Sequence, residues 1–506
     1  MAIDQFSKRS GTRRDRLVGW AALAVATSAL ALLGVFGVAA RLARIYNDDF
    51  RFFADLDQYG TLGFLGQYLS LWNGRYTGAV AIAVGYAVGG VGAIPGLCLV
   101  FVLLLALATW YAAGVLLPFN ARWRRTGPVV IGLGGAVAAI AAAPSFFDSY
   151  LWVSSAMFYV TAVAFSLASA ASSVQAWRGG GRWTKAWAIV VLVLAAGCLE
   201  PATLVLFVAH SLLLGVVAAK RIRRLAVLEI VSVAVSGGAL ALMFLAPGAS
   251  ERRGSFARGL ASTLTETLSG AVRGVGVIPL RVSLPAWCLA VGLGLVIATA
   301  VRWPSRVWAW RALTVAAIGG LVPGIVCSAL SAYALGRVPL RTYAVNTAFA
   351  AWGIALGVGA IAYLVGDRFP PQLRQRTMAV IGSALFLAGA GLEAEGTVSV
   401  IQAESLRAGL VETRDTAVAR ALEESAPAIE ITPAPILISK TSASGDFGFT
   451  EKAGQRQAMI RWYRRYMGIP QDTALTFGTQ PLGYCLRTQP HPSTFALTCD
   501  DLGKER

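Results

Sequence analysis

Long uninterrupted apolar runs recur along most of this chain, and they constrain its fold more than any other feature. Residues 21–40 (AALAVATSALALLGVFGVAA) are one such run without a single charge. A segment in lipid must satisfy its backbone hydrogen bonds internally, so a run of about 20 apolar residues is typical of a transmembrane helix. Barrel strands alternate apolar and polar residues instead. Only 14% of the 506 residues are charged, and we expect an all-α polytopic membrane protein.

The apolar runs predict about eleven transmembrane helices and a separate tail. Residues 76–92 are also apolar, but a twelfth span would reverse every later loop, so we expect a glycine-rich interfacial or re-entrant helix there. Residues 1–395 form the expected membrane body, with a first outer loop at 41–92, and residues 396–506 a small α/β domain. Within this domain, residues 399–425 predict an amphipathic helix, and residues 457–470 predict a helix ended by Gly468 and Pro470. The expected spans lie near 17–40, 93–117, 128–143, 156–176, 185–199, 202–218, 225–246, 284–301, 307–329, 343–365 and 377–394.

Lysine and arginine are distributed unevenly between the loops. With the N-terminus inside, the short inner segments hold 21 of the 44 basic residues, the longer outer loops hold 11 and the tail holds 12. This positive-inside bias predicts a cytoplasmic N-terminus and a periplasmic C-terminus in a bacterial inner membrane, where lipids are the expected surroundings. The same bias accounts for most of the net charge of +18, so no nucleic-acid partner is expected.

The first outer loop combines acidic, basic and aromatic residues at the expected membrane surface. Asp48 and Asp49 follow the first span directly, and the segment WNGRY (72–76) closes the loop. A carboxylate can serve as a base for a hydroxyl group, a guanidinium can bind a phosphate, and aromatic rings can stack on a sugar. The competing interpretation is solvated loop charge, and the spacing alone leaves both open.

Few other titratable residues lie within or beside the expected spans. Glu200 sits at an outer boundary, where a carboxylate is costly unless it is paired or functional, so an ion pair and a substrate or metal role are both open. Glu229 is expected to pair with Arg223 or Arg224. His210 is expected to be a hydrogen-bonded core residue.

The cysteines divide between the two expected parts of the chain. Four of the six lie in or beside spans, where cysteine usually serves as a small apolar residue. Cys485 and Cys499 lie in the tail, on the oxidising side by this topology, so a disulfide between them is expected.

The pattern of the first outer loop resembles the GT-C superfamily of membrane glycosyltransferases, and within it an O-antigen glucosyltransferase-like bacterial group. The resemblance rests on the Asp48–Asp49 pair after span one and on WNGRY about 25 residues later. It spans most of the chain, although Ala249 stands where the family usually has asparagine. Further similar fragments are LWVSSAMFYV (151–160), LEPATL (199–204), LAPGASERR (245–253), GRVPLRTY (336–343) and RRYMGIP (464–470).

The resemblance implies a GT-C-like fold and transfer, with inversion, of a sugar from a polyprenyl-phosphate donor to a glycan or lipid acceptor of the cell envelope. Asp48 and Asp49 are the implied catalytic residues: either of them is the base for the acceptor hydroxyl, and we favour Asp48 for that role, with Asp49 helping to position the substrate. Together with Glu200 they are alternatively the implied ligands of a divalent cation such as Mg²⁺ or Mn²⁺. The departing phosphate needs cationic partners. The implied substrate-binding residues are Trp72, Asn73, Arg75, Tyr76, Glu200, Arg252, Arg337 and Arg341.

Two other functions stay open. An O-antigen polymerase or ligase is also membrane-bound and polyprenyl-dependent, but it relies on arginine and histidine in a large outer loop. A non-enzymatic flippase or transporter of lipid-linked sugars would place paired charges within its spans, where this chain has very few. The gathering of acidic residues at one interface favours the glycosyltransferase.

The topology makes the first testable prediction. Eleven spans from a cytoplasmic N-terminus place the C-terminus in the periplasm, so alkaline phosphatase fused to the C-terminus should be active and a GFP fusion there should be dark. Active phosphatase at residue 125 would contradict the orientation, because residues 118–127 are an inner loop in this scheme. A bright C-terminal GFP fusion would contradict the span count.

Overall fold

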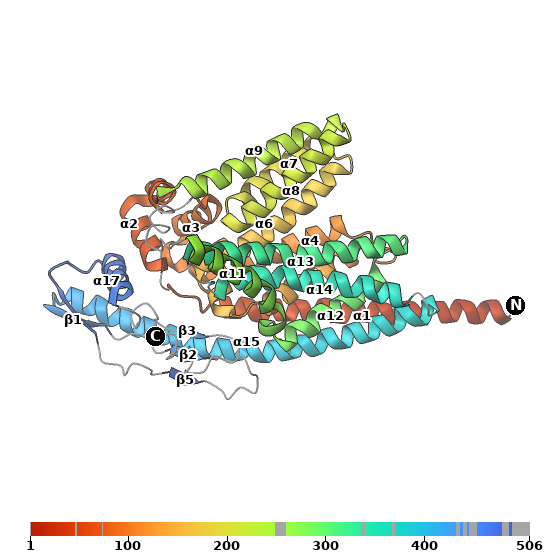
Figure 1. Ribbon diagram of the computed structural model, residues 1–506. Coiled ribbons are helices and arrows are strands. Elements are labelled where there is room, and N and C mark those ends of the chain that lie inside the picture. Colours follow the sequence, from red (N-terminus) through yellow and green to blue (C-terminus); the bar gives the residue numbers. More distant parts are fainter. Residues whose placement is uncertain are drawn as a thin grey trace.

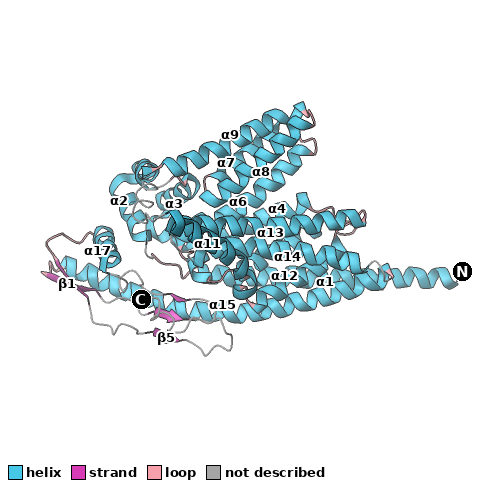
Figure 2. Cartoon of the chain, viewed as in Figure 1, coloured by secondary structure: helices cyan, strands magenta, loops and turns pink. Residues whose placement is uncertain are grey.

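The structure is a computed structural model that describes the backbone of residues 2–45, 48–72, 74–247, 260–335, 338, 340–366, 370–431, 436–438, 443–444, 453–477 and 485–487. Helices dominate these residues (Figures 1 and 2). The α-helices are α1 (Ala2–Ala40), α2 (Asp48–Gln67), α3 (Tyr76–Gly89), α4 (Ile94–Leu116), α5 (Gly127–Ala141), α6 (Val153–Trp177), α7 (Arg182–Ala196), α8 (Glu200–Ala219), α9 (Arg223–Leu245), α11 (Leu260–Arg281), α12 (Leu284–Ala300), α13 (Arg306–Leu335), α14 (Leu340–Gly366), α15 (Pro371–Glu423) and α17 (Ala453–Met467).

Within the described residues, eight helical stretches are long and apolar enough to cross a membrane, so the chain is a multi-pass helical membrane protein. Every segment predicted as a span is helical, and three of them, 128–143, 185–199 and 284–301, correspond to the shorter helices α5, α7 and α12. The eight stretches are Leu17–Ala40, Tyr76–Leu116, Val153–Trp177, Glu200–Ala219, Arg223–Leu245, Arg306–Tyr333, Arg341–Gly366 and Leu373–Gln402.

The stretch Tyr76–Leu116 contains two helices. Its 41 residues are about twice the length that a span needs. Helix α3 ends at Gly89, a 3₁₀ turn covers Gly90–Ala93, and α4 begins at Ile94. Gly90 has φ 56° and ψ −145°, a conformation that favours glycine. Residues 76–89 therefore form a helix separate from the span that follows, and this helix, α3, packs on α2 and α6.

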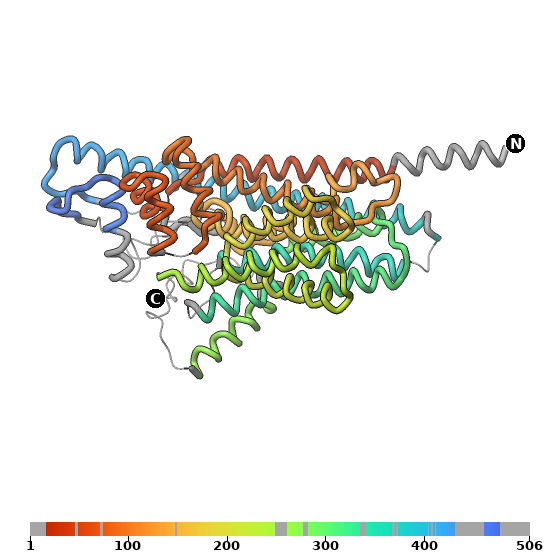
Figure 3. Tube along the Cα trace, turned by 90° about the horizontal axis from the view of Figure 1, so that it is seen from above, coloured from red at the N-terminus to blue at the C-terminus, as the bar shows by residue number. Residues whose placement is uncertain are grey.

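The helices of the bundle run roughly along one long axis of the molecule (Figures 1 and 3). The N-terminus of α1 lies at one end of this axis, and α2, α3 and α17 lie at the opposite end, which we call the α2 end. Helices α6 to α9 form one group of packed neighbours, and α1, α12 and α15 form another. Because α2 and α17 are not among the apolar spans, the α2 end carries a layer of non-spanning helices.

Helix α15 connects the bundle to the tail without interruption. Its 53 residues extend for about 80 Å at 1.5 Å per residue, far beyond the roughly 30 Å of a hydrocarbon core. Its apolar part is Leu373–Gln402, and the amphipathic helix predicted over 399–425 is its continuation. The predicted boundary at 395/396 thus falls inside this helix.

Among its described residues, the tail adds one helix and five short strands. Helix α17 is followed by Gly468 at φ +68°, as the predicted glycine stop after this helix requires. Strand β1 pairs in parallel with β4, with Ala428 opposite Ala474, and a second sheet has the order β3-β2-β5. The strands are β1 (Ala428–Ile431), β2 (Ile436–Ile438), β3 (Ala443–Ser444), β4 (Ala474–Phe477) and β5 (Cys485–Arg487).

Helix α17 docks on α15 through a small polar cluster. Tyr463 is fully buried, and its hydroxyl donates to Asp415 Oδ1 at 2.7 Å. Burial raises the pKa of Tyr463, so the hydroxyl keeps the proton that it donates. Arg414 also bonds to Asp415 and lies with its Cζ 4.9 Å from the centre of the Tyr463 ring. These contacts fix the orientation of α17 on the tail end of α15.

A buried acid inside the α6–α9 group has a partner that differs from the predicted one. Glu229 on α9 is fully buried and contacts His210 Nδ1 on α8 at 2.8 Å. It also accepts a hydrogen bond from Trp177 Nε1 on α6 at 2.7 Å. The predicted pairing with Arg223 or Arg224 is wrong, because Glu229 turns toward the helix interface, where an unpaired carboxylate would be costly. The prediction that His210 is a hydrogen-bonded core residue is confirmed.

Candidate functional site

The candidate residues whose side chains are described gather around the first turns of α6, at the α2 end of the bundle. We call residues 152–158 the α6 hub. Residues from three other parts of the chain reach the hub, although they are separated from it by up to about 190 positions. The contacts are Asp49 with Ser154, Arg75 with Phe158, and Arg341 with Trp152.

Asp49 caps helix α6. Its carboxylate is fully buried and accepts hydrogen bonds from the backbone N–H of Ser154 at 3.1 Å and from the Ser154 hydroxyl. Trp152, the residue that precedes α6, supplies no side-chain cap of its own. Asp49 satisfies one of the first N–H groups of the helix and places a negative charge at the positive end of its dipole. It therefore fixes the beginning of α2 against α6.

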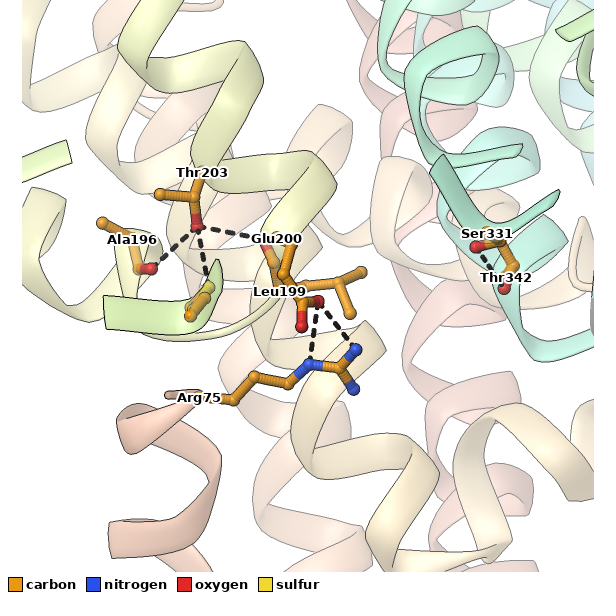
Figure 4. Close-up of polar contacts among 8 residues, drawn as sticks. Arg75, Ala196, Leu199, Glu200, Thr203, Ser331 and Thr342 are labelled. Atoms are coloured by element: carbon orange, nitrogen blue, oxygen red, sulfur yellow. Dashed lines mark hydrogen bonds and ion pairs between the residues drawn. The ribbon is translucent and has the colours of Figure 1, made fainter. Parts of the chain in front are cut away.

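Arg75 and Glu200 form an ion pair between the loop before α3 and the first residue of α8. Arg75 Nε and Nη2 lie 2.9 and 2.7 Å from Glu200 Oε2 (Figure 4), and the two side chains are only 19% and 17% exposed. Burial lowers the pKa of Arg75, but the charge of Glu200 and then the Tyr159 and Tyr68 hydroxyls raise it, and the net shift is upward. Arg75 is therefore always charged, and it faces the Phe158 ring, whose centre lies 5.2 Å from its Cζ.

The turn between α7 and α8 holds Glu200 in place. Thr203 Oγ1 donates to the carbonyl oxygens of Ala196 at 2.8 Å and Leu199 at 3.0 Å, which closes the turn from inside (Figure 4). Leu199 has an extended backbone, with φ −155° and ψ 133°, and α8 begins with Glu200. A carboxylate in the first turn of a helix is favoured by the helix dipole, and here it also meets the guanidinium of Arg75. Of the two roles left open for Glu200, the structure thus contains the ion pair.

Tyr76 contributes to packing between α3 and α7. Its hydroxyl donates to the carbonyl oxygen of Val193 at 2.7 Å, and the neighbouring Thr77 hydroxyl donates to that of Leu194 at 2.8 Å. A side chain at Gly197 would approach the Tyr76 ring to 2.2 Å, so glycine is needed there. The predicted substrate-binding residue Tyr76 therefore positions Arg75, its neighbour, through the fixed start of α3.

Arg341 completes the hub from the first turn of α14. Its Cζ lies 4.5 Å from the centre of the Trp152 ring, which is a cation–π contact. The same turn is tied to α13 by a 3.3 Å hydrogen bond between the hydroxyls of Ser331 and Thr342 (Figure 4). The planar guanidinium of arginine combines such stacking with bidentate binding of phosphate.

Several predicted site residues lie outside the described side chains. The backbone of Asp48 begins α2, and that of Trp72 ends the π-helical turn Tyr68–Trp72. The predicted disulfide also lies outside them. The remaining predictions on such positions are Asn73, Arg252, Arg337, Cys485 and Cys499.

Two of the three carboxylates implied as metal ligands are hydrogen-bonded to protein groups. Asp49 is bonded to Ser154 and Glu200 to Arg75, so each already has a protein donor. The described part of the chain contains no group of three or more His, Cys, Asp or Glu residues that could hold a metal ion.

Sequence reasoning missed the α6 hub as a meeting point. The fragment 151–160 was singled out by resemblance, but Ser154 and Phe158 received no role. A serine near the start of an apolar helix indicates a helix N-terminus, and this signal could have drawn attention to residue 154. Nothing in the sequence indicates that its partner is Asp49, 105 positions away.

Comparisons with known proteins add no family to this picture: no protein-family model matches the chain, and no curated protein matches it significantly.

The helix cap makes the second testable prediction. Asp49→Ala leaves the buried Ser154 N–H without its acceptor, which should destabilise the protein by about 1–3 kcal/mol. Asp49→Asn keeps an acceptor oxygen and should lose less. The measurement is the apparent melting temperature of the purified protein in detergent, followed by size-exclusion chromatography after heating. Asp57→Ala, which removes an exposed acid from the same helix, is the matched control. Equal melting temperatures for Asp49→Ala and Asp57→Ala would contradict the cap.

Proposed function

We propose that the chain is a GT-C-type inverting glycosyltransferase of the bacterial inner membrane. It transfers a sugar from a polyprenyl-phosphate donor to a glycan or lipid acceptor of the cell envelope, on the periplasmic side. The observation that carries this proposal is the α6 hub, where carboxylates, guanidinium groups and aromatic rings from distant segments meet at one end of an otherwise apolar bundle.

The position of the hub suits a substrate that is half lipid. Apolar spans give the polyprenyl chain a lipid-facing route, while the phosphate and the sugar need a polar site at the end of the bundle. Arg75 and Arg341 both lie against aromatic rings of the hub. Guanidinium groups held in this way can stabilise the charge that develops on the departing lipid phosphate.

Asp48 and Asp49 have different roles in this proposal. Asp49 is committed to the α6 cap, so it holds the start of α2 against the hub. Asp48, the first residue of α2, is the base that takes the proton from the acceptor hydroxyl. The hydroxyl oxygen attacks the anomeric carbon, the bond to the phosphate oxygen breaks, and the lipid phosphate leaves with inversion at that carbon.

One observation favours a transporter of lipid-linked sugars instead. The buried Glu229–His210 pair lies within the apolar stretches of α8 and α9, and ionisable residues at such positions are common in transport proteins. The pair is bonded to Trp177 as well, which suits a structural tie between helices. Proteoliposomes separate the two functions, because a flippase moves the lipid-linked sugar across the bilayer without an acceptor.

The catalytic base makes the third testable prediction. Asp48→Asn should lower turnover by about 10²–10⁴-fold, the usual contribution of a general base, with expression and melting temperature unchanged. The measurement is complementation of a deletion strain, read out as the mass of the envelope glycan, with Asp57→Asn as the matched control in the same loop. A double Asp48→Asn, Asp49→Asn variant that glycosylates at the wild-type rate would remove the main support for the enzyme.

The ion pair makes the fourth testable prediction. Arg75→Ala leaves Glu200 half-buried without its cation, so both stability and turnover should fall. The double variant Arg75→Ala, Glu200→Ala removes both charges and should recover the melting temperature. Its turnover should stay about 10–100-fold low, because a charged hydrogen bond to the departing phosphate is still missing. Recovery of turnover together with stability would mean that Arg75 serves only as the partner of Glu200.

A further inference from the structure

A second polar site lies at the α2 end, between the first loop and the tail. Helix α2, the turn after it and α17 enclose a pocket of about 140 Å³, which is room for more than a single water molecule. Its polar wall consists of two arginines, an aspartate and a glutamine. These are Arg51, Asp55 and Gln67 from α2 and Arg465 from α17.

A bend in α2 builds this pocket. Gly60 has φ 65° and ψ 177°, a region that is essentially restricted to glycine. After this bend the chain returns toward the first half of α2. The Phe64 and Tyr68 rings then pack against Phe52, with centroid distances of 6.1 and 5.5 Å. These rings and the half-exposed Tyr59 form the apolar wall of the pocket.

The tail completes the polar wall. Arg465 Nη2 donates to Asp55 Oδ1 at 2.8 Å and to the Gln58 side chain. Arg51 Nε lies 3.5 Å from the other carboxylate oxygen of Asp55, so two guanidinium groups hold this carboxylate in one orientation. Tyr463 of α17 packs edge-on against Phe50, with a centroid distance of 5.3 Å, and supports the docked position.

The pocket adjoins the α6 hub. The Tyr68 ring stacks on Phe158 with a centroid distance of 6.3 Å, and Phe158 is the ring that Arg75 faces. Tyr68 thus lines the pocket on one side and contacts the candidate site on the other. A ligand in the pocket would lie one aromatic side chain away from the hub.

We infer that this pocket is a binding subsite for one sugar ring of the acceptor glycan. The inference rests on the proposed function and names the residues that would hold its acceptor. The C–H face of a sugar ring packs on aromatic rings, whose faces are electron-rich. Its hydroxyl groups bond in pairs to carboxylate, amide and guanidinium groups, which are the polar groups present here.

The surroundings of the pocket indicate the acceptor rather than the donor. Neither α2 nor α17 belongs to the apolar spans among the described helices, so the pocket lies in the layer of non-spanning helices at the α2 end. A polyprenyl-linked donor must keep its lipid beside the spans, whereas an acceptor glycan approaches through water. Two arginines against one aspartate leave an excess positive charge, which favours acidic sugars over neutral ones.

A binding experiment tests this subsite without relying on catalysis. The full-length protein in nanodiscs is mixed with the sugars released from the host envelope polysaccharide by mild acid, and saturation-transfer NMR detects those that bind. The wild type should give signals, and the double variant Tyr59→Ala, Gln67→Ala should lose them about tenfold or more. Leu62→Ala, which alters an 84% exposed side chain of α2 outside the pocket, is the matched control and should bind like the wild type.

Two results would overturn the subsite: no signal with the wild type, or equal signals from the wild type and the double variant. A transfer assay on the same proteins separates the subsite from the proposed function. Loss of an acceptor contact should raise KM for the acceptor about tenfold with little change in kcat. Sugar binding without any transfer would contradict the proposed glycosyltransferase activity but not the subsite. Transfer by the double variant with an unchanged KM for the acceptor would contradict the subsite alone.

Discussion

The arrangement of helices at the α2 end depends on the hydrogen bonds that the buried carboxylate of Asp49 accepts from Ser154. A charged group without solvent is costly unless it is hydrogen-bonded, and the hydrogen bonds from Ser154 in the first turn of α6 stabilise Asp49 in its buried position. That requirement fixes where α2 starts relative to the bundle. Helix α2 also lines the pocket and bends at Gly60, so the contact between Asp49 and α6 helps to fix the position of the pocket as well.

The Arg75–Glu200 ion pair and the Glu229–His210 hydrogen bond lie in different parts of the bundle and have different physical consequences. Arg75 and Glu200 lie at the α2 end and keep some exposure, so the cost of removing their charges from water is partly avoided. Glu229 and His210 are buried between α8 and α9, where breaking their hydrogen bond would leave a buried polar group without its partner. The first pair thus lies at the end of the bundle with some exposure, and the second joins two helices inside it.

The sequence predicts local features of this fold well and long-range partners poorly. Apolar runs of span length predict helices because lipid leaves the backbone no other option, and every predicted span is helical. Gly468 predicts the end of α17, since the chain there needs a backbone angle that other residues avoid. The partner of Glu229 was predicted incorrectly because nearby arginines were visible in sequence, while His210 becomes a neighbour only after α8 and α9 pack.

The candidate site shows the same division. The chain's acids and arginines at loop positions could be selected from the sequence, because charges are rare in a membrane body and tend to be functional there. Whether an acidic residue can act in catalysis depends on the groups that its side chain contacts in the folded protein. In the sequence, Asp48 and Asp49 are adjacent residues of the same type, and the role of base can be assigned to either. In the structure, the carboxylate of Asp49 caps helix α6. No local pattern distinguishes the two residues, since the difference arises from a serine on another helix.

The uninterrupted helix α15 links the apolar bundle to the layer of non-spanning helices at the α2 end. This helix packs on α1 and α12 within the apolar bundle, and its tail end holds α17 through Asp415. Helix α17 in turn places Arg465 against Asp55 of the first loop. The loop is therefore held from two sides, by α6 through Asp49 and by α15 through α17. The proposed acceptor subsite between loop and tail depends on this double support, because the walls of the pocket come from segments about 400 residues apart in the chain.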